Sequence, residues 1–164
     1  MLALPALAVT TAFAAGCSHQ YIANSDLEDN DDNWKVVHFC EKYRRAIEER
    51  DIETLVALAS PRYFETGGNA KSGDDMDYNG LRSYLATKFK LTKAIRYEIR
   101  YHRIAEVRLE KVGDKVEHVL NVDFTYTASF QIPTSKGDVW NRAVRDNRLQ
   151  IVTDGDSFKI LAGM

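Results

Sequence analysis

The spacing of apolar residues changes once along the chain, from a helical period to a strand period. Between Val36 and Ile47, apolar residues recur every three or four positions with charged residues on the other side, which predicts an amphipathic helix. A second, shorter helix follows Asp51, which can cap its start, and Pro61 ends it. A third helix is expected from Asn79. The first half is therefore predicted to be mainly helical.

In the second half, apolar and polar residues alternate, which predicts long strands with one buried face. Strands are expected over 95–109, 116–132, 139–153 and 157–161, joined by tight turns. In the third of these the alternation becomes uncertain around Asp146 and Asn147, which indicates a bulge. Helices followed by an antiparallel meander predict an α+β fold, with the N-terminal helices packed on one face of a strongly curved sheet.

The first residues predict export. Residues 1–16 contain no charged side chain and are rich in Ala and Leu, as in the apolar core of a secretory signal peptide. The sequence Ala14-Ala15-Gly16-Cys17 resembles a bacterial lipobox, in which a signal peptidase cuts before an acylated cysteine. We therefore expect a lipoprotein signal peptide over 1–16, and acyl chains on Cys17 that anchor the protein in a membrane.

Ser18 after the cysteine resembles the signal that sorts lipoproteins to the outer membrane. The expected location is thus the bacterial cell envelope, at the outer membrane, facing the periplasm or the cell surface. Two other interpretations stay open. Cleavage after Ala14 would give a free periplasmic protein, and a merely hydrophobic N-terminus would give no export. No Lys or Arg precedes the apolar run, which fits a start codon farther upstream.

Residues 17–33 are strongly acidic and are expected to form a flexible tether. Five Asp or Glu lie among the seven residues from Asp26 to Asp32, with Leu27 as the one apolar member. Such a composition opposes burial and favours a solvated, extended segment. Residues 34–164 are then expected to form one folded domain.

Charge and cysteine content narrow the function classes. Twenty-two Lys and Arg against twenty-four Asp and Glu give a net charge of −2, too balanced for a protein whose main task is to bind nucleic acid. Outside residues 1–16, no apolar stretch is long enough to cross a bilayer. With Cys17 acylated, Cys40 is the one remaining cysteine, so no internal disulfide is expected. Cys40 is interpreted as a small buried apolar residue.

Three segments, in the right order, resemble nuclear transport factor 2-like and SnoaL-like domains. Residues Lys42–Leu58 resemble the opening of these domains, Asn79–Leu85 the start of their third helix, and Arg148–Ile160 their last hairpin. The resemblance spans Trp34 to Leu161. It implies a cystatin-like α+β cone with a central pocket between the helices and the sheet. It also implies a sheet through which such domains often dimerise.

The resemblance to the ketosteroid isomerases of this superfamily concerns three positions. Tyr43 stands where those enzymes have a tyrosine that donates to the substrate oxygen. Glu65 is close to the position of their carboxylate base without aligning with it, and Asn147 or Arg148 stands near their second acid. A base must lie within hydrogen-bond reach of its proton, so isomerase chemistry is disfavoured.

A hollow cone would present several of these side chains to a ligand. His118 lies between Val116 and Leu120 on an apolar strand face, so it is expected to point into the cone or to lie near an edge, without a charged partner on its own face. No histidines share a metal-ligand spacing, so neither a metal nor a cofactor is predicted. The candidate pocket residues are Tyr43, Tyr63, Glu65, His118, Phe124 and Tyr126.

The third long strand carries a candidate partner surface. Trp140, Arg142 and Arg148 are expected on one face, with Arg145 opposite, if no bulge intervenes. Trp and Arg are enriched where proteins dock, whereas a solvated sheet face is the simpler interpretation.

Three functions remain open. The first is a non-catalytic envelope lipoprotein whose domain binds a partner protein, with a homodimer through the sheet as one form. The second is a carrier or sensor of a small apolar ligand in the cone. The third is a SnoaL-like isomerase, dehydratase or hydrolase. The incomplete acid and base set favours the first.

Overall fold

The computed structural model describes residues 20–66 and 75–164. Three helices and two short strands precede a meander of four strands, which confirms the α+β class. None of the helices in the described ranges is long and apolar enough to cross a membrane. In chain order the elements are α1 (Asp31–Glu49), α2 (Ile52–Leu58), β1 (Phe64–Glu65), β2 (Met76–Asp77), α3 (Tyr78–Lys90), β3 (Ala94–Val112), β4 (Lys115–Thr134), β5 (Gly137–Asp154) and β6 (Ser157–Ala162).

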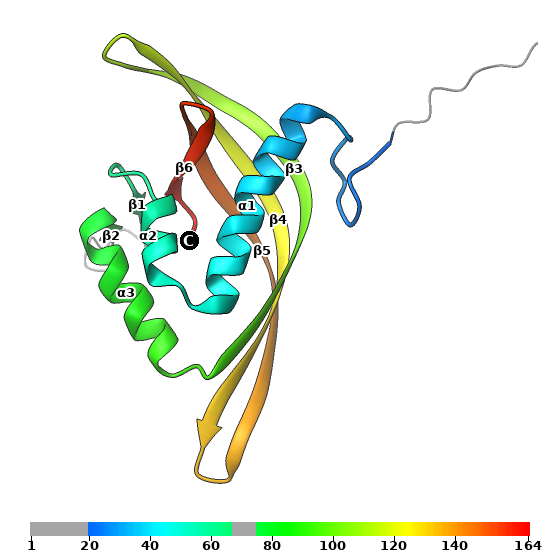
Figure 1. The fold of residues 1–164 in the computed structure, drawn as a ribbon, viewed down its shortest axis with the longest axis vertical. Helices are drawn as coiled ribbons and strands as arrows, with labels where there is room; N and C mark the ends of the chain where they lie inside the picture. Colours follow the sequence, from blue (N-terminus) through cyan, green and yellow to red (C-terminus); the bar gives the residue numbers. More distant parts are fainter. Residues whose placement is uncertain (1–19, 67–74) are drawn as a thin grey trace, which may run out of the picture.

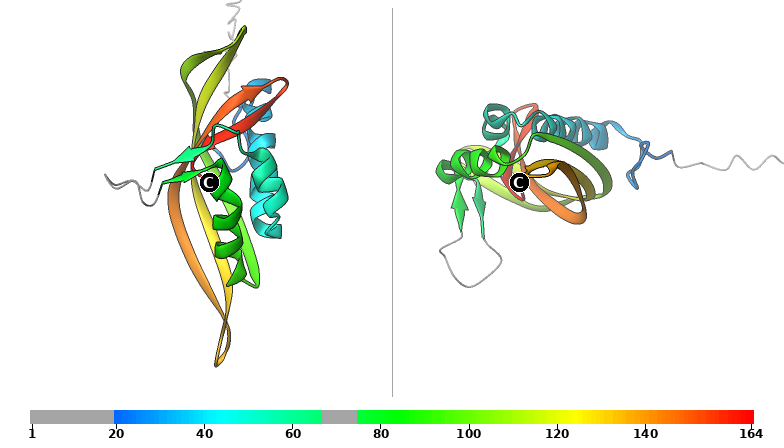
Figure 2. Two further views of the ribbon diagram at one scale, coloured as in Figure 1. Left: turned by 90° about the vertical axis from the view of Figure 1, so that its left-hand side faces the viewer. Right: turned by 90° about the horizontal axis from the view of Figure 1, so that it is seen from below.

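The four-stranded sheet has the order β3-β4-β5-β6, and all neighbouring strands are antiparallel. β3, β4 and β5 are much longer than β6 and bend around the helices (Figure 1). The helices lie on one side of this sheet (Figure 2). We call the sheet face toward the helices the inner face and the opposite one the outer face. The strongly curved sheet that the sequence predicts is therefore present.

Short polar residues fix where each helix begins. The side chains of Asn30, Asp51 and Asp77 accept hydrogen bonds from backbone N–H groups three residues later, at 2.9, 3.0 and 2.8 Å. Each bond satisfies one of the amides that a helix start leaves without a partner. These caps therefore define the first residues of α1, α2 and α3.

The core lies between α1 and the inner face. Phe124 on β4 is 1% exposed and Leu149 on β5 is fully buried. Phe39 on α1 meets Phe158 on β6 with ring centroids 5.7 Å apart. Cys40 is 0% exposed, which confirms that it is a buried apolar residue. Burial also raises the pKa of its thiol far above the ordinary value, so this cysteine is not a nucleophile at neutral pH.

The bulge expected near Asp146 and Asn147 is absent, and the β4–β5 register is regular there. Arg145 and Asn147 lie on the inner face and Asp146 on the outer one. The sequence did not show the alternation of apolar and polar residues here because the inner face borders a cavity. Polar side chains are tolerated at a cavity, so both faces of β5 carry polar residues at this point. Register shifts occur instead in the β3–β4 pairing, between Tyr101 and Arg103 and again farther along β3, and in the β5–β6 pairing, between Gln150 and Ile151.

The described part of the expected tether, residues 20–33, differs from a flexible spacer. Ile22 and Leu27 are buried in the core, and α1 already begins at Asp31. The backbone N–H of Asp26 donates to the carbonyl of Tyr101 at 2.9 Å. The acidic side chains do not prevent docking, because some find partners on the sheet. The expected signal peptide over 1–16 and Cys17 lie outside the described residues.

The Asp26 carboxylate makes the main polar contact between this segment and the sheet. It lies 2.6 Å from the guanidinium of Arg100 and 2.7 Å from Nδ1 of His102. The hydrogen bond with His102, followed by the charge of Arg100, holds the pKa of Asp26 below its ordinary value. The carboxylate is therefore favoured in its charged form.

Candidate functional site

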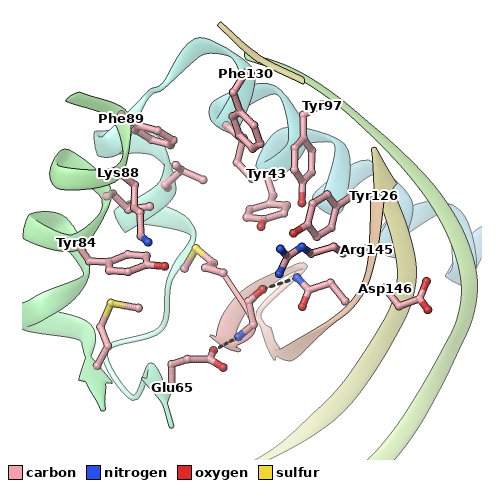
Figure 3. A pocket seen from close by; sticks show the side chains of 17 residues that line it. Tyr43, Glu65, Tyr84, Lys88, Phe89, Tyr97, Tyr126, Phe130, Arg145 and Asp146 are labelled. Carbon is pink, nitrogen blue, oxygen red and sulfur yellow. Dashed lines mark hydrogen bonds between the residues drawn. The ribbon is translucent and has the colours of Figure 1, made fainter. Parts of the chain in front are cut away.

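A cavity of about 590 Å³ lies between α1, α3 and the inner face of the sheet (Figure 3). Its walls combine aromatic, aliphatic and a few charged side chains, as is typical of small-molecule sites. The cone is therefore hollow at this end. The lining residues are Tyr43, Ile47, Leu55, Glu65, Met76, Tyr84, Leu85, Lys88, Phe89, Tyr97, Tyr126, Phe130, Arg145, Asp146, Asn147, Gly163 and Met164.

Three tyrosines form the wall on the side of α1 and the sheet. The rings of Tyr97 and Tyr126 stack with centroids 5.1 Å apart, and Tyr43 meets Tyr97 edge-on at 6.4 Å. Burial raises the pKa of both Tyr43 and Tyr97, so their hydroxyls stay protonated at neutral pH. This wall offers flat apolar surface together with neutral hydroxyl groups.

The opposite wall is the face of α3 that carries Tyr84, Lys88 and Phe89. The Lys88 ammonium lies 5.2 Å from the centre of the Tyr84 ring, within the range of a cation–π contact. A second cation, Arg145, enters from β5, where it pairs across the sheet with Tyr126. Arg145 is exposed, and no hydrogen bond or ion pair joins it to another residue within 20–66 and 75–164.

The carboxylate of Glu65 is held by the chain itself. It accepts a hydrogen bond from the backbone N–H of Gly163, and the hydroxyl of Tyr63 lies 3.4 Å from the same oxygen. The side-chain amide of Asn147 donates to the carbonyl of Gly163 at 2.9 Å. Figure 3 shows these two bonds clamping the residues after β6 at the edge of the cavity. We call Glu65, Asn147 and Gly163 the clamp.

Gly163 is required at this point of the chain. Its φ is +94°, in the region that favours glycine. A Cβ atom there would lie 2.0 Å from the carbonyl oxygen of Arg148, far inside van der Waals contact. The clamp therefore depends on the close approach of Gly163 to β5.

Three of the six candidate pocket residues, Tyr43, Glu65 and Tyr126, line the cavity. Tyr63 and Phe124 do not line it, since both are buried in the core at 2% and 1% exposure. Tyr63 still acts on the site indirectly, through its contact with Glu65.

His118 does not point into the cone; it lies at the solvent-exposed end of the sheet, in line with the second of its two expected positions, and it has a charged partner that was not expected. It is exposed, lies away from the cavity, and its Nδ1 contacts the carboxylate of Glu106 on β3. His118 lies outside the cavity because the end of the long β3–β4 hairpin extends past the helices (Figure 1). Apolar residues at this end, such as Val116, are exposed for the same reason. The charged partner, Glu106, lies on the neighbouring strand β3. Alternation along β4 alone could not predict this cross-strand contact.

The expected partner surface lies on the outer face, and its residues do share that face. Trp140 is 44% exposed, and the guanidinium of Arg96 lies 5.0 Å from the centre of its ring system. Arg148 makes a two-pronged ion pair with Asp123, with the longer contact at 3.1 Å. Arg142 is exposed on the same face.

Sequence reasoning missed the lining residues Tyr97 and Lys88, and it named Asn147 and the face of Arg145 without assigning either residue to the pocket. Tyr97 belongs to the alternating inner positions of β3, so strand parity could have found it. Lys88 follows Tyr84 by four residues on α3, which places both on one helix face. Within the described ranges, no group of three or more His, Cys, Asp or Glu side chains is placed to hold a metal ion.

Comparisons of the fold give clear matches among solved structures. A putative dehydratase from the NTF2-like family of Streptomyces avermitilis superposes with a TM-score of 0.58 at 14% identity, over 80% of this chain and 93% of that one. A ketosteroid isomerase-like protein from Erwinia carotovora atroseptica gives 0.56 at 12% identity, over 82% and 94%. This chain has the nuclear transport factor 2-like fold. A putative scytalone dehydratase from Novosphingobium aromaticivorans agrees, with 0.58 at 10% identity over 80% of each chain.

The likeness to nuclear transport factor 2-like structures is one of fold. No protein-family model matches the chain, and no curated protein matches it. At such low identities a shared fold does not carry a shared activity, so function has to be argued from the site.

Proposed function

We propose that this domain binds a small, mostly apolar molecule in the cavity and does not transform it. The observation that carries the proposal is the open cavity of about 590 Å³ walled by Tyr43, Tyr97 and Tyr126 on one side and α3 on the other. Ligand sites commonly have volumes of roughly 300 to 1,000 Å³ and mainly apolar walls. This function is the carrier or sensor that the sequence left open.

The clamp argues against proton-transfer chemistry. A general base must direct its carboxylate at the substrate proton, whereas Oε2 of Glu65 accepts a hydrogen bond from the Gly163 amide and lies next to the Tyr63 hydroxyl. Asn147, close to the position of the second acid in the isomerases, is a neutral amide that donates to Gly163. Two of the fold neighbours are described as putative dehydratases, so an isomerase, dehydratase or hydrolase is the alternative that an activity screen would test.

Binding of Nile red, a neutral dye that fluoresces in apolar surroundings, tests the proposal. We expect saturable one-to-one binding to the wild type, and at least about a tenfold weaker affinity for Ile47→Trp, which fills the cavity. Ile52→Trp is the matched control, since Ile52 is also partly buried but does not line the cavity. Absence of saturable binding, or equal loss in both variants, would contradict the proposal.

A second candidate function is docking of a protein on the outer face. The described helices all lie on the other side, and Trp140, Val144 and Arg142 are exposed there. The partner we propose is a second copy of this chain. Sedimentation analysis of wild type and Trp140→Glu is the test, with a dimer expected for the wild type and a monomer for the variant. A monomeric wild type would remove this candidate.

Anchoring at the outer membrane through Cys17 also remains a proposal. It is supported by residues 1–16 and the Ala-Ala-Gly-Cys sequence. Replacing Cys17 with Ser should release the protein from membranes into the soluble periplasmic fraction. Unchanged membrane partition of the variant would exclude lipid attachment at this residue.

A further inference from the structure

Two cations face the cavity from different walls. Arg145 projects from the inner face of β5, and Figure 3 shows its guanidinium turned into the cavity beside Tyr126. Lys88 projects from α3, with its ammonium over the Tyr84 ring. Neither makes an ion pair within the part of the chain that the structure describes. Both cations therefore face the cavity without a carboxylate partner from the described part of the protein.

The two acidic residues at the cavity, Glu65 and Asp146, form no ion pair with these cations. The Glu65 carboxylate is engaged by the amide of Gly163. Asp146 belongs to the outer face of β5, accepts a hydrogen bond from the Thr125 hydroxyl at 2.6 Å, and points away from the cavity in Figure 3. Both carboxylates are thus directed to other partners.

We infer that the ligand of this pocket is a carboxylate with a flat or chain-like apolar body, bound through its charged end by Arg145 with Lys88 nearby. The inference rests on the proposed binding function and adds the chemical class of the ligand. A guanidinium presents a planar fork of N–H donors that matches the two oxygens of a carboxylate. Beside aromatic walls the attraction is less weakened by water than on an open surface.

The geometry assigns different tasks to the rest of the pocket. The stacked rings of Tyr97 and Tyr126 offer flat surface to the apolar body, next to the inward-facing guanidinium. The buried hydroxyl of Tyr43 is neutral and so does not repel the carboxylate. A neutral molecule of the same shape would fill the same space but leave Arg145 without a partner.

A matched pair of probes, naphthalene-2-carboxylate and its neutral amide naphthalene-2-carboxamide, separates charge from shape. Calorimetry on the wild type should give at least about tenfold tighter binding of the carboxylate, the scale of one charge-assisted hydrogen bond. Arg145→Gln should remove this preference and leave amide binding unchanged. Arg103→Gln, at an exposed arginine of β3 that does not line the cavity, is the matched control and should behave as the wild type.

The outcomes are distinct. A wild type that binds Nile red but shows no preference for the carboxylate overturns this inference and leaves the proposed function standing. Equal preference in the wild type and Arg145→Gln, with thermal unfolding of the variant unchanged, also overturns it. A protein that binds neither Nile red nor either naphthyl compound overturns both.

Discussion

Glu65 accepts a hydrogen bond from the backbone amide of Gly163, so β1 is joined to the residues that follow β6, across the edge of the pocket. In a proton-transfer enzyme a carboxylate at this place would face the substrate. Here its nearest donor is the protein's own backbone. The pair therefore gives Glu65 a structural contact at the edge of the pocket.

Replacing Glu65 tests this structural role. Glu65→Gln keeps an oxygen acceptor for the Gly163 amide and should change the free energy of unfolding little, whereas Glu65→Leu leaves that amide unpaired and should cost about 1 to 3 kcal/mol. Urea denaturation of both variants is the measurement. A robust enzymatic turnover that falls about a hundredfold or more in Glu65→Gln, or in Tyr43→Phe, would show instead that proton transfer occurs here.

Gly163→Ala should be among the most damaging small substitutions. The new methyl group would collide with the carbonyl of Arg148 at a positive φ, and we expect a loss of about 3 kcal/mol or more together with weaker Nile red binding. Gly155→Ala is the control: its φ is +61°, but nothing lies within 4 Å of the added atom. It should lose about 1 kcal/mol from backbone strain alone. Equal losses in the two variants would argue against a close approach at Gly163.

Phe124→Ala tests the core. Phe124 is 1% exposed between the sheet and α1, and its truncation should cost about 3 to 5 kcal/mol. Phe64→Ala removes the same atoms from a side chain that is 50% exposed, and should cost less than about 1 kcal/mol. Chemical denaturation gives both values. A midpoint that hardly moves in Phe124→Ala would mean that this face of β4 is not closely packed.

The docking of residues 20–30 should weaken in acid. Contacts with His102 and Arg100 lower the pKa of Asp26 below its ordinary value of 3.8. A carboxyl group whose pKa is lowered in the folded state stabilises that state above its unfolded pKa, and the contribution is lost as the pH falls through the folded value. Thermal unfolding followed between about pH 5 and pH 2 should therefore show a steeper loss in the wild type than in Asp26→Asn.

Asp156→Asn serves as the control for this measurement. Asp156 lies in the β5–β6 turn and has no ion pair in the described ranges, so its replacement should leave the pH profile of the wild type intact. Identical profiles for the wild type and Asp26→Asn would contradict a stabilising role for the Asp26 contacts.

The fold could be predicted from the sequence because the spacing of apolar residues and the succession of helices and strands can be read from local stretches of the chain. The alternation in β3 and β4 predicts which side chains face the helices, and Phe124 and Tyr126 fall on that face as expected. The expectation that Tyr43 reaches the pocket came from the resemblance. Strand alternation predicts which face a side chain lies on, but it does not predict whether other side chains cover it. That difference separates Phe124, which is buried in the core, from Tyr126, which lines the cavity.

The missing part of the site depends on contacts between distant segments. Glu65 and Gly163 are 98 residues apart, and no local pattern indicates that they meet. Strand alternation put Arg145 opposite Arg142 and Arg148 only if no bulge intervened, and its regular pairing with Tyr126 places it on the inner face. For the segment around Asp26, composition suggested a solvated spacer because a count of charges does not include the partners that the sheet provides.

The docked N-terminal segment has a consequence for how far the domain could stand from a bilayer. A flexible spacer over residues 17–33 would allow a reach of roughly 55 Å between Cys17 and α1 when fully extended. Because the described chain begins at residue 20 and is fixed to β3 around Asp26, only three residue steps separate Cys17 from the described part, and covalent geometry limits them to a span of about 10 Å. A lipid at Cys17 would then hold the domain close against the membrane, with this end of the molecule facing the headgroups and little freedom to turn.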